Sequence, residues 1–584
     1  MKRSIFLILV ISLLFFTRLI NLSWSLPYPM HPDERNMATA IQNLNCFNQK
    51  IEIDQANKSF IDCLNPHFFA YGQWPLYFGY GLIILYQWLK GILGEMINYE
   101  QAVLSLRLIS ATASIINAWV LVKIINLISK KKSADDLIAF LVIIFSPFFI
   151  QFSHFGTTES LLMLFYTLII YLNLRLIKNQ ITLVAFIFFS ALITGLAMAT
   201  KISSAIFLLI PFTAFIYLLA RPAILLKKKI TAAEKKFFFL EILFAFLKFL
   251  LLTIIFFIIF SPYNFIDWPD FLSALKYESD VALGNYVVFY TRQFVDTWPV
   301  LFQFEKIFPY ALGRLSTILF LLGFFCLSWK NSQINFLRLA FIFYFIPTAF
   351  MFAKWTRFMA PVMPVMIAFN LLFLKKITVG RWFKNLILIF LVLPGLAYLS
   401  IYWHPDVRFT ASDWIFKNIP QQARILSETA NVVDIPIQNP LVKNNGLPPN
   451  YQYVSFNFYD LDVNQSLEAS LGNLLNQADY IFVPSRRIFF NHTCFNEKLI
   501  LLPGFNLAKR CENLKKSYPK LNDYYQKLFS GELGFVKIAE FTSFPRLCLP
   551  FNLGCFNFND EPAEETWTVF DHPVIRIFKK SSHI

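Results

Sequence analysis

SIFLILVISLLFFTRLI, residues 4–20, is an apolar run long enough for one helical crossing of a bilayer, and HPDE, residues 31–34, follows it closely. The run resembles a signal peptide, but it lacks a small-residue cleavage site and many apolar runs follow it. We therefore expect a retained first helix. Asp33 and Glu34 then lie just beyond a membrane span, where charged side chains need solvent, partners or a function.

Composition places the chain among integral membrane proteins. Of its 584 residues, 57% are hydrophobic, 69 are Phe and only 15% are charged. The net charge of +16 would favour a nucleic-acid partner in a soluble protein, but Lys and Arg collect here in short links between apolar runs. That distribution is typical of membrane topology signals, so we expect no nucleic-acid partner.

The apolar runs predict about eleven transmembrane helices, because a hydrocarbon core of about 30 Å takes about 20 helical residues. Their expected starts are near residues 4, 104, 136, 158, 181, 203, 237, 307, 335, 358 and 385. Basic residues fall in alternate loops, among them residues 130–132, 221–236 and 375–384. The positive-inside rule then predicts a multi-pass cell-membrane protein with a cytoplasmic N-terminus and an extracytoplasmic C-terminal part. An apolar stretch at 75–96 would invert the later loops if it spanned, so we expect it to hug or re-enter the membrane.

Two domains are expected from this pattern. Residues 1–402 form a transmembrane module with an outer loop at 25–102, and residues 403–584, which have an ordinary soluble composition, form an extracytoplasmic α/β domain. In the second domain the pattern predicts a helix at 411–418 and strands at 480–484, 535–541 and 574–578.

Six of the seven cysteines fall in segments expected outside the cytoplasm, where disulfides form. The sequence leaves their pairing in the C-terminal domain open. Two share the outer loop, four lie in the C-terminal domain and one lies in a span: Cys46 and Cys63, then Cys494, Cys511, Cys548 and Cys555, and finally Cys326.

Three carboxylates on the outer side are candidates for chemistry. Pro32 and Asp33 suit the first turn of an interfacial helix, where the helix dipole keeps a carboxylate ionised. An ionised Asp33 can accept a proton from an attacking hydroxyl or hold a divalent cation, whereas helix capping is the structural alternative. Glu34 and Glu159 can support either use, although a position at the border of a span also explains Glu159.

Four cations are expected at the same face, where they could bind a phosphate in the outer headgroup layer: Arg107, Lys201, Lys354 and Arg357. General attraction to lipid headgroups is the alternative explanation. Three histidines, His31, His67 and His154, could support the site, but roles in turns or in the core explain lone histidines equally well. An acidic run at 560–565 could recognise an acceptor, and ordinary folding accounts for it as well.

Several short motifs follow one another along most of the chain. They are Arg18-Leu19-Ile20, Pro32-Asp33-Glu34, Asn65-Pro66-His67, Trp74-Pro75-Leu76, Arg107-Leu108, residues 153–159, Gly195-Leu196 to Lys201, Lys354-Trp355-Thr356-Arg357-Phe358 and Ala411-Ser412-Asp413-Trp414-Ile415. This order resembles that of GT-C-fold glycosyltransferases of the family 39 type. That group uses polyprenyl-phosphate sugars and includes protein O-mannosyltransferases and bacterial enzymes that add aminoarabinose to lipid A.

The resemblance implies a mainly α, polytopic GT-C bundle in which residues 1–402 are the catalytic module. It implies an inverting transfer of a hexosyl or pentosyl group from a polyprenyl phosphate to a protein, lipid or glycan hydroxyl on the outer face. Asp33 would be the base, supported by Glu34 and Glu159, and the four cations would bind the donor phosphate. No cofactor is certain, because members of this fold differ in metal use; a divalent cation would sit at Asp33, Glu34 and Glu159.

Two other functional classes remain open at this point. A lipid-linked sugar transporter or flippase would also carry interfacial charges, but it should place ionisable residues near the membrane midplane, where few occur. A non-catalytic membrane scaffold would explain the C-terminal domain but not the charges at separate helix ends. The sugar, the acceptor, the lipid length and the oligomeric state are not encoded in any recognisable pattern.

Overall fold

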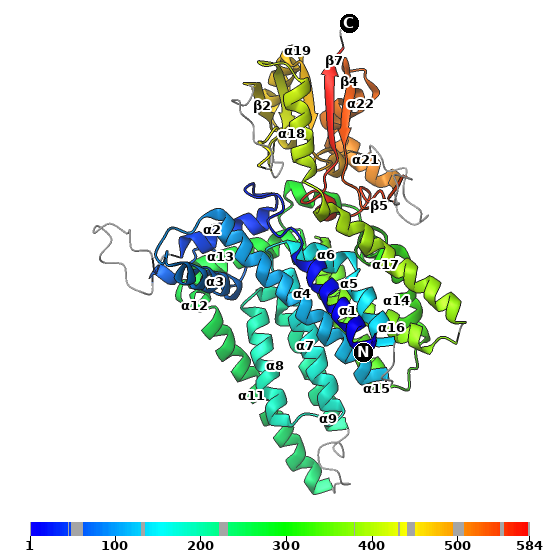
Figure 1. The fold of residues 1–584 in the computed structure, drawn as a ribbon. Coiled ribbons are helices and arrows are strands. Elements are labelled where there is room, and N and C mark those ends of the chain that lie inside the picture. The colour runs from blue at the N-terminus through cyan, green and yellow to red at the C-terminus, as the bar shows by residue number, and fades with distance from the viewer. Residues whose placement is uncertain are drawn as a thin grey trace.

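The computed structural model describes residues 2–44, 46–47, 62–129, 135–220, 232–378, 380–429, 433–440, 450–493, 507–548 and 554–581. It is a mainly helical bundle with a sheet-containing domain at one end (Figure 1). Residues 130–132, most of the basic cluster at 221–236 and Cys494 lie outside the described residues.

Helices of the bundle follow one another with short links. They are α1 (Lys2–Leu19), α4 (Tyr99–Ser129), α5 (Asp135–Ile144), α6 (Pro147–His154), α7 (Glu159–Ile177), α8 (Leu183–Met198), η3 (Ile202–Leu208), α9 (Leu209–Ala220), α11 (Ala232–Phe260), η5 (Gln303–Ile307), η6 (Pro309–Gly313), α14 (Arg314–Cys326), α15 (Ser332–Ala349), η7 (Thr356–Val362), α16 (Met363–Lys376) and α17 (Arg381–Trp403).

Among the described residues, seven helical stretches are long and apolar enough to cross a membrane: Tyr99–Ser129, Glu159–Ile177, Ile202–Ala220, Lys236–Phe260, Pro309–Cys326, Thr356–Lys376 and Trp382–Trp403. Two shorter apolar helices, Ile8–Leu19 and Leu183–Met198, accompany them. The multi-pass, mainly helical class is thus confirmed, while the number eleven remains a prediction. Among the eleven predicted spans, the one starting near residue 136 is the least regular. Pro147 divides it into α5 and α6, because proline can begin a helix but disrupts its interior.

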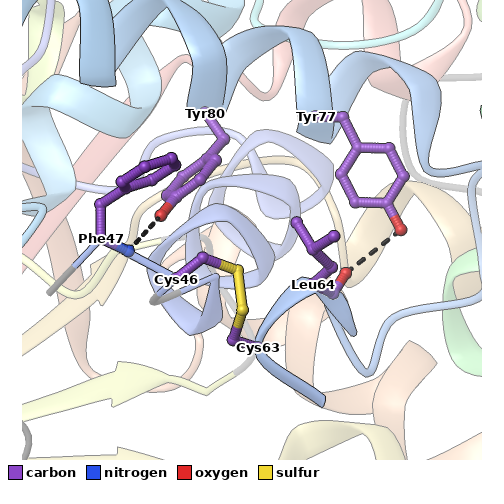
Figure 2. The surroundings of a disulfide bond; sticks show 6 residues. All are labelled: Cys46, Phe47, Cys63, Leu64, Tyr77 and Tyr80. Atoms are coloured by element: carbon purple, nitrogen blue, oxygen red, sulfur yellow. Dashed lines mark hydrogen bonds between the residues drawn. A yellow bond between two sulfur atoms is a disulfide. The ribbon is translucent and has the colours of Figure 1, made fainter. Parts of the chain in front are cut away.

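The outer loop contributes α2 (Pro32–Asn43), η2 (Asp62–Leu64) and α3 (Trp74–Lys90). Helix α3 is formed by the apolar stretch at 75–96 that we expect to hug or re-enter the membrane. Met37, Ile41, Leu76 and Leu106 share a buried core that joins α2 and α3 to α4. A disulfide between Cys46 and Cys63 closes the loop, and hydrogen bonds from Phe47 to Tyr80 and from Tyr77 to Leu64 hold it against α3 (Figure 2).

A second loop, after α11, carries α12 (Tyr263–Ile266), α13 (Trp268–Leu283) and η4 (Phe289–Phe294). Figure 1 places α2, α3 and α13 at the end of the long helices that is nearer the C-terminal domain.

The C-terminal domain is built on a five-stranded sheet in the order β2-β1-β3-β7-β4. Strands β1, β2 and β3 pair in parallel, whereas β7 is antiparallel to β3 and β4. Its elements are α18 (Val407–Asn418), β1 (Arg424–Glu428), β2 (Gln452–Phe456), η8 (Phe458–Asp460), α19 (Gln465–Gln477), β3 (Tyr480–Val483), α20 (Phe489–His492), α21 (Leu507–Ser517), α22 (Pro519–Ser530), β4 (Phe535–Phe541), β5 (Arg546–Cys548), β6 (Cys555–Asn557), α23 (Glu565–Thr568) and β7 (Ile575–Lys580).

The predicted helix at 411–418 and the three predicted strands correspond to α18, β3, β4 and β7. Strands β1 and β2 carry no comparable signal, since β1 ends in Ser427-Glu428 and β2 is a mostly exposed edge strand. A disulfide between Cys548 and Cys555 joins β5 to β6, and Cys511 is also disulfide-bonded. Cys326 is free, as its place in a predicted span suggests.

Candidate active site

The first turn of α2 presents two neighbouring carboxylates to different surroundings. His31 caps the helix, because its Nδ1 accepts a hydrogen bond from the Asp33 backbone N–H at 3.2 Å, and Pro32 occupies the first helical position. Glu34 points into the bundle and is 1% exposed, whereas the Asp33 side chain is 19% exposed. Successive residues on a helix point about 100° apart, which separates the two carboxylates.

Glu34 forms a buried ion pair with Arg107 of α4. Two parallel bonds of 2.7 Å join the Arg107 Nε and Nη2 to the two Glu34 oxygens, and Nη1 donates to the carbonyls of Leu22 and Trp24 at 2.7 Å each. The Gly156 N–H donates to Glu34 Oε1 at 2.6 Å, and a Cβ on Gly156 would lie 2.9 Å from that oxygen. This pair therefore ties α2 to α4 and to the α6–α7 turn, and both Glu34 oxygens and all three Arg107 nitrogens have partners within the fold.

Asp33 faces a different partner, Arg357 of η7. The Arg357 Nη1 donates to Asp33 Oδ2, and both side chains are about one fifth exposed, at 18% and 19%. Burial raises the pKa of Asp33, but the charge of Arg357, the nearby His31 and Lys201 and a hydrogen bond from Tyr71 outweigh it and leave the pKa below its usual value. Asp33 is therefore an ionised carboxylate held against a cation.

Lys201 reaches the same cluster through an unusual backbone contact. The N–H groups of Gly72 and Trp74 donate to the carbonyls of Thr200 and Ala199 at 3.0 Å each, so the two chains run side by side. A Cβ on Gly72 would lie 2.0 Å from the Ala199 oxygen, and only glycine permits this approach. As a result the Lys201 Nζ lies 4.9 Å from the centre of the Tyr71 ring.

Two further carboxylates act on these cations. Glu159, in the first turn of α7, is buried and interacts electrostatically with Lys201 and Arg357. Glu278 of α13 is exposed and interacts with the same two cations and with Asp33. Sequence reasoning missed Glu278 and Tyr71. Tyr71 lies inside a motif-bearing stretch, but Glu278 carries no signal beyond an outer-loop position.

The Nε of Arg357 is an unused donor. Its guanidinium stacks 4.6 Å from the centre of the Trp355 ring, and its Nε is buried with no hydrogen-bond acceptor among the described residues. A buried unpaired N–H on a charged group is unfavourable, and an anion placed there would satisfy it.

The remaining predicted residues lie in other contacts. Lys354 donates to the Phe352 carbonyl at 3.0 Å, and burial lowers its pKa to about 8. The His154 ring stacks on Tyr402 with centroids 3.9 Å apart and has the carbonyls of Ile150 and Ile20 within hydrogen-bonding distance. His67 has a positive φ of 49° and its backbone N–H bonds to Asn65, which is a turn role. His31 contacts Asp33 but is buried between Phe155 and Phe570, and this burial lowers its pKa.

The three carboxylates suggested for a divalent cation do not converge. Glu34 is committed to Arg107, and Asp33 is committed to Arg357. Within the described part of the chain, no group of three or more His, Cys, Asp or Glu side chains could hold a metal ion. The donor set thus does not fit the metal site that the sequence suggests, and the cluster of Asp33, Glu159, Lys201 and Arg357 is the candidate active site.

Known structures show limited similarity to this chain. ArnT from Cupriavidus metallidurans in the apo state is 15% identical at a TM-score of 0.41, with 72% of this chain and 65% of that chain covered. The same protein bound to undecaprenyl phosphate is 12% identical at 0.43, with coverages of 71% and 72%. The archaeal oligosaccharyltransferase AglB from Archaeoglobus fulgidus, in complex with an inhibitory peptide and a dolichol phosphate, is 11% identical at 0.43, with coverages of 83% and 70%. This chain thus spans just under two thirds of the apo ArnT chain.

No curated protein matches the sequence. A family match does cover Arg107, Glu159 and Lys201, since residues 84–264 match the family described as dolichyl-phosphate-mannose-protein mannosyltransferase. The resemblance predicted from the order of motifs is therefore confirmed, and over residues 84–264 the chain is similar to the dolichyl-phosphate-mannose-protein mannosyltransferases.

Proposed function

We propose that this protein is a membrane glycosyltransferase that moves a sugar from a polyprenyl phosphate to a hydroxyl acceptor at the outer face of the membrane. The observation that carries the proposal is the pairing of an ionised carboxylate, Asp33, with a cation that retains a buried unused donor, the Nε of Arg357. The family match over residues 84–264 supports the reaction class. A hydroxyl needs a proton acceptor and a departing phosphate needs cations, and this cluster offers both.

The proposed reaction is a single displacement. The acceptor oxygen bonds to the anomeric carbon while the bond from that carbon to the phosphate oxygen breaks. The polyprenyl phosphate leaves with the electron pair, and the configuration at the anomeric carbon is inverted. Asp33 takes the hydroxyl proton and later releases it to water. Because Arg357 keeps Asp33 a weak base, we expect the proton to move late, when the attacking oxygen has become acidic.

Donor binding would also change the state of Asp33. A phosphate that bonds to the Nε of Arg357 competes for the guanidinium now held by Asp33, and Lys201 can share the added negative charge. Removing part of the cationic partner raises the basicity of Asp33 when the sugar is in place. Glu159 and Glu278 would balance the cations in the empty site.

The roles of Glu34 and Arg107 in this proposal differ from those that the sequence suggests. The two side chains form an ion pair with each other, so we propose that they hold the first turn of α2 in place and neither take part in the reaction nor bind the phosphate. Lys354, whose Nζ donates to Phe352, is likewise assigned to the turn that carries Arg357.

The proposed topology has the N-terminus in the cytoplasm and the C-terminal domain outside. The positive-inside pattern supports this orientation. The position of α2, which carries Asp33, at the end of the bundle nearer the C-terminal domain supports a candidate site on the same side (Figure 1). We propose residues 1–402 as the catalytic module and residues 403–584 as the outer domain.

The test is turnover of radiolabelled polyprenyl-phosphate sugars by the purified protein in lipid. We expect wild type to release or transfer sugar, Asp33→Asn to lose about 100-fold or more, and Glu100→Gln, an exposed carboxylate in the first turn of α4, to behave as wild type. The same assay with EDTA tests for a metal requirement. Equal rates for Asp33→Asn and wild type would remove Asp33 as the base, and a silent wild type across a broad donor panel would contradict the proposed activity.

A further inference from the structure

A segment of the C-terminal domain, residues 560–572, is built into the membrane bundle. Ala563, Trp567, Val569 and Phe570 belong to the same buried core as the bundle helices. Asp571 accepts hydrogen bonds from the hydroxyls of Tyr398 and Tyr402 on α17, both at 2.9 Å. We call residues 560–572 the junction segment, because these contacts join the C-terminal domain to the helices of the bundle.

Within the junction segment, Glu564 bonds directly to Thr356, the residue that precedes Arg357. One of its oxygens, Oε2, accepts from both the backbone N–H and the hydroxyl of Thr356, at 3.0 and 2.9 Å. The other, Oε1, accepts from Gln293 Nε2 and from the Thr566 N–H, at 3.0 Å each. Glu564 is 1% exposed, so its carboxylate is a fully bonded, buried anion.

Thr356 begins η7, and Arg357 is the next residue along it. The residue in the capping position, Trp355, makes no side-chain capping bond, so the first N–H groups of η7 need an acceptor from elsewhere. Glu564 supplies it, and a carboxylate at a helix N-terminus is also favoured by the helix dipole. The C-terminal domain thus caps the helix that carries Arg357.

The same segment supports the other half of the ion pair. Phe570 packs on the ring of His31 with centroids 4.3 Å apart, and His31 caps α2, which carries Asp33. Asp33 and Arg357 are each the second residue of a helix, and both helix starts contact the junction segment.

We propose that Glu564 is a positioning residue for Arg357: by capping η7 from the C-terminal domain, it fixes the guanidinium against Asp33 and aims the Arg357 Nε at the donor phosphate. This inference rests on the proposed function for its catalytic consequence. Its structural part, that the Thr356 N–H is held by Glu564, can be measured without turnover.

The first experiment follows hydrogen exchange of the Thr356 amide in wild type, Glu564→Ala, Glu564→Gln and Glu561→Ala. Glu561 is the matched control, since it lies in the same segment but pairs with Arg576 of β7 at 2.8 Å. We expect exchange at Thr356 to be about tenfold faster or more in Glu564→Ala, intermediate in Glu564→Gln, whose amide oxygen can still accept, and unchanged in Glu561→Ala. Unchanged exchange in Glu564→Ala would overturn the inference, whether or not the protein proves to be a glycosyltransferase.

The second experiment measures turnover. Glu564→Ala should lower kcat about tenfold or more and shift the acidic limb of the pH–rate profile upward, because a displaced Arg357 no longer depresses the pKa of Asp33. Thr356→Val should cause a smaller loss that is not additive with Glu564→Ala. An active wild type with an unshifted profile in Glu564→Ala would refute the positioning role alone. If Glu564→Ala does not fold, Glu564→Gln and Thr356→Val carry both measurements.

Discussion

Asp33 and Glu34 are adjacent, yet the structure predicts opposite consequences when each is neutralised. Glu34 and Arg107 are 1% and 2% exposed, and Glu34→Gln would leave the Arg107 guanidinium buried without its counter-charge. Breaking a buried pair in this way costs about 3–5 kcal/mol. Asp33 and Arg357 are partly solvated, at 19% and 18% exposure, so Asp33→Asn should cost about 1 kcal/mol or less in stability.

The effects on turnover should be the reverse of the effects on stability. Asp33→Asn removes the proton acceptor and should lower turnover about 100-fold or more, whereas Glu34→Gln should change turnover per folded molecule by less than about tenfold. The measurements are equilibrium unfolding in lipid-detergent mixtures and sugar release normalised to the folded fraction. Arg107→Gln in the Glu34→Gln background removes both buried charges and should recover part of the lost stability.

The reasoning would be refuted by a Glu34→Gln protein that is as stable as wild type but inactive. That result would mean that Glu34 contacts the reactants and that the bonds to Arg107 and Gly156 contribute little to the fold. A strongly destabilised Asp33→Asn protein would equally contradict the assignment of Asp33 to chemistry.

Three further predictions follow from particular contacts. Gly72→Ala should destabilise the fold by about 1–3 kcal/mol and lower turnover, since its Cβ would lie 2.0 Å from the Ala199 oxygen. The control is Gly81→Ala in α3, whose Cβ would meet nothing within 4 Å; thermal unfolding should show it to be neutral or stabilising by up to about 1 kcal/mol. Arg357→Lys keeps the charge but loses the Nε donor, so the KM for a polyprenyl-phosphate donor should rise about tenfold, and an unchanged KM would contradict the phosphate role. Burial would lower the pKa of His572, but Asp560 and Asp571 raise it to about 10. Because the folded pKa lies above the usual 6.5, the contribution of protonated His572 to stability is complete below pH 6.5. The free energy of unfolding should fall as pH rises toward 10, by up to about 1.4 kcal/mol per pH unit, and the curve should be flatter for His572→Gln.

Local patterns were sufficient to predict much of the architecture. The start of α2 was predictable because Pro32 and the following carboxylates suit a first turn whatever lies around them. The strand at 535–541 was predictable because the stretch is rich in aromatic and β-branched residues, and β4 has the same bounds. Span lengths depend on bilayer thickness and on apolar length, which are also local properties.

The division of labour within the site could not be predicted, because it depends on directions in space. The sequence places Asp33 and Glu34 side by side, but their opposite environments follow from the 100° step along a helix and from the positions of α4 and η7. Arg107 and Arg357 are both outer-face arginines in sequence terms, and only the packed bundle decides that one meets a buried glutamate and the other an accessible aspartate.

Glu564 shows the limit most clearly, since it lies 208 residues from Thr356. The acidic run at 560–565 has the composition of a solvated surface, yet Asp560, Glu564 and Glu565 are all buried. A usable signal does exist at the other end of the contact. A helix that begins at Thr356, with Trp355 rather than Ser, Thr, Asp or Asn in the capping position, leaves its first N–H groups without a local acceptor. Such a helix start, inside a membrane protein, implies that an acceptor arrives from a distant segment, and a conspicuously acidic stretch in the outer domain is where that acceptor should be sought.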